Sequence, residues 1–191
     1  MTKHTSLKTE ILDIGWKVLQ EKGREALHLR DLAEKGGCSV GTIYNLFENV
    51  DEIILRLNLK CLDLMYRSLH REMEKGIEKG EDLKGTLRRT GKAYLKFGME
   101  YPFLWKSLFE NLTVDPLPEW YQKKVEGGIE EIERAIVESY GLKSDRATEI
   151  VSFFWSAIHG ITSIMLNKKR GQFDEAYLNS YIDHCLKGFV G

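Results

Sequence analysis

Small and hydrogen-bonding residues gather between positions 41 and 45, where the sequence reads Gly-Thr-Ile-Tyr-Asn. Hydroxyl and amide groups donate hydrogen bonds to phosphate oxygens, and a glycine lets a phosphate backbone approach closely. The apolar residues in and beside this stretch recur at helical spacing and face a core: Val40, Ile43 and Phe47. The others point outward or sideways: Gly41, Thr42, Tyr44 and Asn45. The chemistry that this pattern favours is nucleic-acid binding.

Three elements would hold these groups in place. Apolar residues at i, i+3 and i+4 predict a helix over 29–35. Gly36 and Gly37 would end that helix, because a glycine just past a helix takes a positive φ without strain. Ser39 can then cap a second helix over 40–47. This layout predicts a helix-turn-helix with its second helix in the major groove of DNA, although a glycine turn alone fits an ordinary helical hairpin equally well.

The stretch from about residue 7 to residue 57 resembles the DNA-binding domain of the TetR family of bacterial one-component regulators. The most specific part of the resemblance is Ser-Val-Gly-Thr-Ile-Tyr at 39–44, followed by Phe47. The resemblance implies that Thr42 and Tyr44 hold phosphates, and that Arg30 and Asn45 meet base edges, where they could read guanine and adenine. The DNA-binding set that we expect comprises Arg30, Ser39, Val40, Gly41, Thr42, Tyr44, Asn45 and Lys8.

Two positions depart from the family pattern. Val50 stands where the family often has a lysine that binds a phosphate, and Leu46 stands where a histidine or tyrosine is common. We therefore expect operator affinity to depend more on lysines of the first helix, such as Lys8. Residues 1–50 hold seven Lys/Arg and seven Asp/Glu, so their net charge is zero. Nonspecific DNA binding should be weak, whereas base readout and dimer avidity need no high net charge.

Composition predicts an all-α fold of about nine helices. The 191 residues are 42% hydrophobic and 30% charged and include only three prolines, and no strand-length run alternates polar and apolar residues. We expect a helix-turn-helix domain over 1–50 and a helical effector-binding and dimerisation domain over 51–191. Three cysteines without CxxC spacing suggest neither a disulfide framework nor a metal site, and no signal peptide is evident, so we expect a cytoplasmic protein.

The region that follows the helix-turn-helix domain should contain six helices, and the last of them begins at position 174. A capping box at Asn49–Glu52 begins a long helix over about 49–76, which joins the two domains. Further helices are expected over 82–99, 102–111 and 119–140, and another begins at Ser144 or Asp145. Residues 150–167 carry no charge over eighteen positions, but regular polar interruptions favour a buried helix over a membrane span.

Aromatic side chains are unusually dense between positions 94 and 121. Eight of the twenty aromatics of the chain fall within these 28 residues. Such side chains line apolar ligand pockets, although any one of them could simply fill a helical core. The ligand-binding set that we expect comprises Tyr66, Tyr94, Phe97, Phe103, Trp105, Leu108, Phe109, Tyr121, Trp155 and His159.

A second motif, Trp155-x-x-x-His159-Gly160, resembles the signature of one class of C-terminal domain in TetR-type regulators, and the Tyr-Pro-Phe-Leu-Trp run at 101–105 fits the same class. In that family the last two helices usually form a four-helix bundle with those of a partner subunit. Small residues on the same helix would allow close helix approach. The dimer interface that we expect comprises Ser156, Ile158, Gly160, Ile161, Met165, Tyr177 and Tyr181.

These patterns together predict a homodimeric, ligand-responsive DNA-binding regulator, a repressor that binds a near-palindromic operator and is released by a small apolar or aromatic effector. No nucleophile, paired carboxylates or metal-ligand cluster argues for an enzyme, and we expect no metal, cofactor or membrane partner. The alternative is a helical adaptor or ligand-binding protein with weak or no DNA binding. Substitution of Thr42 or Tyr44 separates the two, because an adaptor would tolerate either change.

Overall fold

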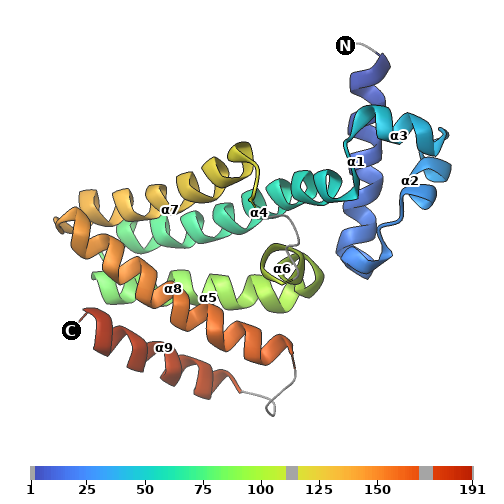
Figure 1. The fold of residues 1–191 in the computed structure, drawn as a ribbon. Coiled ribbons are helices and arrows are strands. Elements are labelled where there is room, and N and C mark those ends of the chain that lie inside the picture. Colours follow the sequence, from blue (N-terminus) through green and yellow to red (C-terminus); the bar gives the residue numbers. More distant parts are fainter. Residues whose placement is uncertain (1–2, 111–115, 168–173, 191) are drawn as a thin grey trace. The chain divides into compact units, whose positions relative to one another are not determined.

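The computed structural model describes residues 3–110, 116–167 and 174–190, and within these ranges the chain is helical with no strand (Figure 1). The predicted all-α class is therefore confirmed. The helices are α1 (Lys3–Lys22), α2 (Leu29–Lys35), α3 (Val40–Leu46), α4 (Val50–Glu78), α5 (Leu83–Glu100), α6 (Pro102–Phe109), α7 (Glu119–Tyr140), α8 (Ser144–Leu166) and α9 (Glu175–Val190), with a 3-10 turn η1 (Arg24–Ala26) after α1.

Local side-chain chemistry explains where several helices begin. The Ser39 hydroxyl accepts a hydrogen bond from the Thr42 N–H at 3.0 Å, as predicted for the cap of α3. The Asn49 and Asp174 side chains cap α4 and α9 in the same way, at 2.9 and 2.7 Å. In the predicted capping box the Glu52 carboxylate reaches back one residue further than expected and accepts the N–H of Glu48 at 2.7 Å.

Contacts divide the chain into two compact units. The first comprises Met1–Asp63 and Tyr101–Gln122, and the second comprises Leu64–Glu100 and Lys123–Gly191. Helix α4 contributes residues to both units, and α6 belongs to the first although it follows α5 of the second. The sequence led us to expect two consecutive domains, over 1–50 and 51–191. That boundary at residue 50 stays a prediction.

The two glycines between α2 and α3 serve different purposes. Gly37 has φ +61°, the left-handed conformation expected at this turn. Gly36 has a negative φ, but a Cβ at this position would lie 2.5 Å from Cδ1 of Ile11 on α1. A side chain at Gly36 would therefore force the buried Ile11 side chain to shift.

In the first unit, α1 packs against α2, η1 and α6 around a closed apolar core. The side chains of Leu19, Leu57 and Trp105 have no exposed surface. A polar pair is buried with them, because the Asn58 amide donates to the Ser107 carbonyl oxygen at 2.9 Å while the Ser107 hydroxyl donates to Asn58 Oδ1 at 2.6 Å.

In the second unit, α5 packs against α8 and α9. The buried side chains of α8 recur at helical spacing and include Ile150, Phe154, Ile158 and Ile161. Among the described residues, α8 alone is long and apolar enough to cross a membrane, by length and composition. A third of its most apolar 18-residue segment is buried inside the protein.

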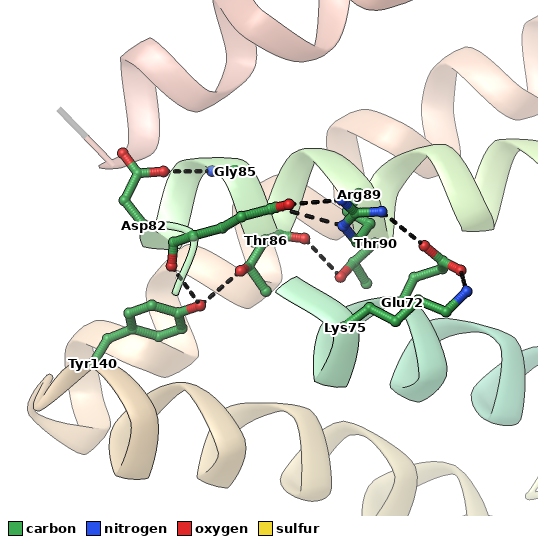
Figure 2. A network of polar contacts seen from close by, with 9 residues as sticks. Glu72, Lys75, Asp82, Gly85, Thr86, Arg89, Thr90 and Tyr140 are labelled. Atoms are coloured by element: carbon green, nitrogen blue, oxygen red, sulfur yellow. Dashed lines mark hydrogen bonds and ion pairs between the residues drawn. The ribbon is translucent and has the colours of Figure 1, made fainter. Parts of the chain in front are cut away.

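Polar residues fix the end of α4 to α5 and α7 within the second unit (Figure 2). The Arg89 guanidinium on α5 binds Glu72 on α4 at 3.3 Å and Glu81 in the α4–α5 turn at 2.6 Å. The Tyr140 hydroxyl on α7 is 2.6 Å from Thr86 Oγ1 and donates to the Glu81 carbonyl oxygen at 3.3 Å. This network holds three helices together at one end of the unit.

The network predicts an acid-sensitive contribution to stability. Hydrogen bonds from Lys75 and then Arg89 hold the pKa of Glu72 below its usual range, and the Arg89 hydrogen bond does the same for Glu81. A carboxylate with a lowered pKa stabilises the fold above its unfolded pKa of about 4.3, and this stabilisation is lost as the pH falls through the folded pKa. We expect Arg89→Gln to lower the Tm at pH 7, with the difference from wild type shrinking toward pH 3.

Thermal unfolding between pH 3 and pH 7 measures this difference. Lys92→Gln is the matched control, because it removes one positive charge from an exposed position on the same helix. A Tm difference for Arg89→Gln that is the same at pH 3 and pH 7 would show that the ion pairs do not cause it.

Candidate nucleic-acid interface and ligand cavity

Helix α3 presents one apolar face to the core of the first unit and one polar face to solvent. Ile43 is 1% exposed and Phe47 is 2% exposed, whereas the Tyr44 side chain is 56% exposed. Gly41 and Asn45 are also exposed. The outward face therefore combines a glycine, a phenol and an amide, as the spacing of the sequence predicts.

The hydroxyls of Ser39 and Thr42 lie 2.9 Å apart at the start of α3. Each hydroxyl has one proton to donate, and their mutual bond uses only one of the two. When Ser39 is the donor in this pair, the Thr42 proton remains free to bind an acceptor outside the protein. The Ser39 cap thus fixes the position of Thr42 as well as the helix.

The structure places Arg30 and Lys8 differently with respect to α3. Arg30 is exposed on α2, which packs against α3 in the first unit. Lys8 on α1 instead turns toward the C-terminal end of α3, where its ammonium group donates to the Leu46 carbonyl oxygen at 2.8 Å. Seven of the eight expected DNA-binding residues therefore lie on α2, on α3 or at the α3 cap, and Lys8 is engaged elsewhere.

A small apolar cavity of about 50 Å³ lies within the second unit. Both hydroxyl groups in its lining are already bonded: Thr90 donates to the Thr86 carbonyl oxygen at 2.9 Å, and the Tyr94 hydroxyl is 2.8 Å from Nδ1 of His159. The surface facing the cavity is apolar throughout. The lining residues come from α4, α5, α7 and α8: Leu69, Leu87, Thr90, Gly91, Tyr94, Ile132, Val151, Phe154, Trp155 and Ile158.

The Trp-x-x-x-His-Gly motif lies beside this cavity. The rings of Trp155 and His159 are stacked, with their centroids 4.9 Å apart and an interplanar angle of 29°. His159 is in turn bonded to Tyr94 on α5. The motif therefore connects α8 to α5 where both helices line the cavity.

Two family models match the chain. The model described as "Bacterial regulatory proteins, tetR family" matches residues 11–57, which include α2, α3 and the start of α4. The model described as "Tetracyclin repressor-like, C-terminal domain" matches residues 87–186, more than half of the chain. The chain belongs to the TetR family. It is thus a ligand-responsive DNA-binding transcriptional regulator, and regulators of this family are soluble and generally have no enzymatic activity.

Solved structures with the same fold span nearly the whole TetR-family chain. A protein of unknown function from Rhodococcus sp. RHA1 is 17% identical, with a TM-score of 0.77 over 97% of this chain and 96% of its own. A TetR family transcription regulator from Marinobacter aquaeolei VT8 is 16% identical, with a TM-score of 0.66 over 96% and 95%. The TetR family regulator PfmR from Thermus thermophilus is 22% identical, with a TM-score of 0.56 over 93% and 97%. No curated protein matches this chain in sequence.

The residues expected to bind a ligand in this TetR-family protein divide between the two units. Tyr94 and Trp155 line the cavity, and His159 contacts both of them. Tyr66 and Phe97 are buried elsewhere in the second unit. The other five belong to the first unit: Phe103, Trp105, Leu108, Phe109 and Tyr121. Of these, Trp105 is fully buried, and Phe103 lies against Gly23, where a Cβ would be 2.9 Å from its ring.

The residues expected at the dimer interface also divide. Ile158 and Ile161 are 2% and 4% exposed and belong to the core of their own unit, so they present little surface to a partner. Ser156 is exposed, and Tyr177 on α9 is 48% exposed. Gly160, Met165 and Tyr181 are half-buried.

Eight cavity residues were not expected there from the sequence: Leu69, Leu87, Thr90, Gly91, Ile132, Val151, Phe154 and Ile158, the last of which was expected at the dimer interface. Most of them are aliphatic residues on the apolar faces of helices. Their sequence pattern is the same whether they fill a close-packed core or line a cavity. Gly91 inside α5 carried the one available signal, because a glycine in a helix interior often marks a close approach. A Cβ at Gly91 would lie 2.7 Å from the Phe154 ring.

Proposed function

We propose that this TetR-family regulator represses transcription in the cytoplasm by binding a near-palindromic operator as a homodimer, and that a small apolar or aromatic effector releases it. The observation that carries the proposal is the outward face of α3, where Tyr44, Asn45 and Gly41 are exposed beside the positioned Thr42 hydroxyl. Each subunit would place this face in a major groove, with half-sites about 34–36 Å apart or a multiple of that distance.

An exposed apolar surface on α8 and α9 supports the dimer. Phe153, Trp155 and Ile164 of α8 are between 38% and 53% exposed, and Tyr177 of α9 is 48% exposed. Large exposed apolar side chains on neighbouring helices are typical of a protein interface. With Ile158 and Ile161 facing inward, we assign the partner-facing surface to these side chains and to Ser156.

The cavity in the second unit supports the choice of effector. With the Thr90 and Tyr94 hydroxyls already bonded, a ligand there gains from apolar contact rather than from new hydrogen bonds. The cavity of about 50 Å³ is also much smaller than the engineered cavity of about 150 Å³ that holds a benzene molecule. An aromatic effector would therefore have to push the lining helices apart.

Helix α4 offers a route from the cavity to the helix-turn-helix domain. Leu69 on α4 lines the cavity, and the same helix begins at Val50, directly after the α3 segment. An effector that binds the expanded form more tightly than the resting form would shift the equilibrium toward the expanded form. The accompanying movement of α4 would change the spacing of the two helix-turn-helix domains in the dimer and lower operator affinity.

Selection of bound sequences from a random duplex pool at about 0.15 M salt tests the DNA-binding proposal. Wild type should enrich a near-palindromic motif. A Thr42→Ala, Tyr44→Phe double variant should bind that motif about 100-fold more weakly or worse, because a hydrogen bond to a charged group contributes about 1.5–3 kcal/mol.

Thr148→Ala is the matched control, because it removes an exposed threonine hydroxyl on α8 without touching the helix-turn-helix domain. It should enrich the same motif as wild type. Failure of wild type to enrich any motif, or equal enrichment by the double variant, would overturn the proposal and favour the adaptor alternative.

A further inference from the structure

The Lys8 side chain spans from α1 to the end of α3. Its ammonium group donates to the Leu46 carbonyl oxygen at 2.8 Å and lies 4.7 Å from the centroid of the Phe47 ring. Leu46 is the last residue of α3, and the final carbonyl groups of a helix have no partner within the helix. A cation at this end also meets the negative end of the helix dipole. Lys8 therefore satisfies a terminal carbonyl and stabilises the end of α3.

The same ammonium group is part of a second cluster, centred on Glu52 in the first turn of α4. Glu52 Oε1 lies 3.6 Å from Lys8 Nζ and accepts a hydrogen bond from Arg56 Nε at 2.6 Å. Glu52 Oε2 accepts the Glu48 N–H at 2.7 Å. Burial alone would raise the pKa of Glu52, but these donors hold it below its usual range, so the carboxylate remains charged.

The charge of Lys8 is thus already engaged by three groups of its own unit. Rotation of the side chain toward a DNA phosphate would leave the Leu46 carbonyl oxygen without this donor. It would also remove one of the two cations beside Glu52. The lysine that the sequence suggests as a substitute phosphate anchor, given Val50, is instead built into the junction between α1, α3 and α4.

We propose that Lys8 is a positioning residue for operator recognition: it fixes the orientation of α3 against α1 and α4 and does not bind DNA phosphate. The inference rests on the proposed DNA-binding function of α3. It distinguishes Lys8 from Thr42 and Tyr44, whose side chains lie on the outward face of α3 and at its cap.

The salt dependence of DNA binding separates positioning from phosphate binding. Each phosphate contact contributes about 0.9 to the slope of log K against log salt. Loss of a phosphate-binding lysine from both subunits of a dimer would therefore reduce the slope by about 1.8. Loss of a positioning residue lowers the affinity for the operator by the same factor at every salt concentration.

The experiment compares Lys8→Met, Lys8→Arg and wild type on the selected operator and on an unrelated duplex, between about 0.05 and 0.2 M salt. We expect Lys8→Met to lower operator affinity about tenfold, with an unchanged slope and unchanged affinity for the unrelated duplex. Lys8→Arg should restore operator affinity, because a guanidinium can donate to the same carbonyl. Lys22→Met, at the other end of α1, is the control for loss of charge.

The alternatives give different results. A slope reduced by about 1.8, with affinity for both duplexes falling together, would identify a phosphate contact and overturn the proposal. Unchanged operator affinity in Lys8→Met would also overturn it, while leaving the DNA-binding function intact. If wild type binds no operator, the proposed function fails and this inference fails with it.

A measurement without DNA tests the structural part of the inference. Amide hydrogen exchange should be faster at residues 43–47 in Lys8→Met than in wild type, and unchanged in Lys22→Met. Equal exchange at these amides in all three proteins would show that Lys8 does not hold the end of α3.

Discussion

Replacement of Trp105 by alanine is expected to lower the free energy of unfolding by about 3–5 kcal/mol, the usual cost of removing a fully buried aromatic side chain. Trp105 on α6 has no exposed surface, and its ring lies 5.2 Å from that of Phe109, centroid to centroid. The loss combines the apolar area returned to water with the cavity left in the first unit. Urea denaturation, followed by far-UV circular dichroism, measures it.

Trp120→Ala is the matched control, because Trp120 belongs to the same unit and is 38% exposed. Its removal should cost clearly less, although its ring contacts Arg56 at 5.4 Å. If Trp105→Ala costs less than about 1 kcal/mol, the side chain does not belong to a close-packed core, and the ligand-binding role expected from the sequence gains support.

The helices could be predicted from the sequence because the signals that set them act over a few residues. Ser39 meets an N–H three positions away, and so do Asn49 and Asp174. The polar face of α3 follows from helical periodicity alone, so Tyr44 and Ile43 could be placed on opposite sides. These features decide the fold class and most of the candidate DNA interface.

The aromatic cluster could not be assigned from the sequence because its members pack against residues far away along the chain. Phe103 meets Gly23, whereas Tyr94 pairs with His159. Density along the sequence does not show that the break at Pro102 separates residues of two units. The contact of Lys8 could not be predicted for the same reason, because its partner Leu46 lies 38 positions away.

Val50 is the first residue of α4, and several contacts hold this end of the helix in place. Val50, the position where the family resemblance leads one to expect a lysine, follows the Asn49 cap, and Asp51 beside it binds Arg24 at 2.9 Å. The start of α4 is therefore held by contacts with η1 and α1 rather than by a cation that faces outward. Operator affinity in this regulator should depend correspondingly more on how firmly α3 is held.

Replacement of Asn58 by alanine is expected to destabilise the protein by at least about 1–3 kcal/mol, the cost of leaving one buried polar group unsatisfied. The Asn58 amide meets the Ser107 carbonyl oxygen in the last turn of α6, where helix carbonyls lack internal partners. Asn58→Ala also removes the acceptor of the Ser107 hydroxyl, whereas Ser107→Ala removes only one of the two bonds. We expect Asn58→Ala to be the more destabilising change in urea denaturation.

A double-mutant cycle tests whether the two residues act as a pair. Asn58→Ala combined with Ser107→Ala should cost less than the sum of the single changes, with a coupling of about 0.5–3 kcal/mol. Asn179→Ala on α9 lies outside this pair and should add to Ser107→Ala without coupling. Strict additivity of the first pair would mean that the hydrogen bond from the Ser107 hydroxyl to Asn58 Oδ1 contributes nothing net. Coupling would show that Asn58 fixes α6 to α4 inside the unit that carries α3.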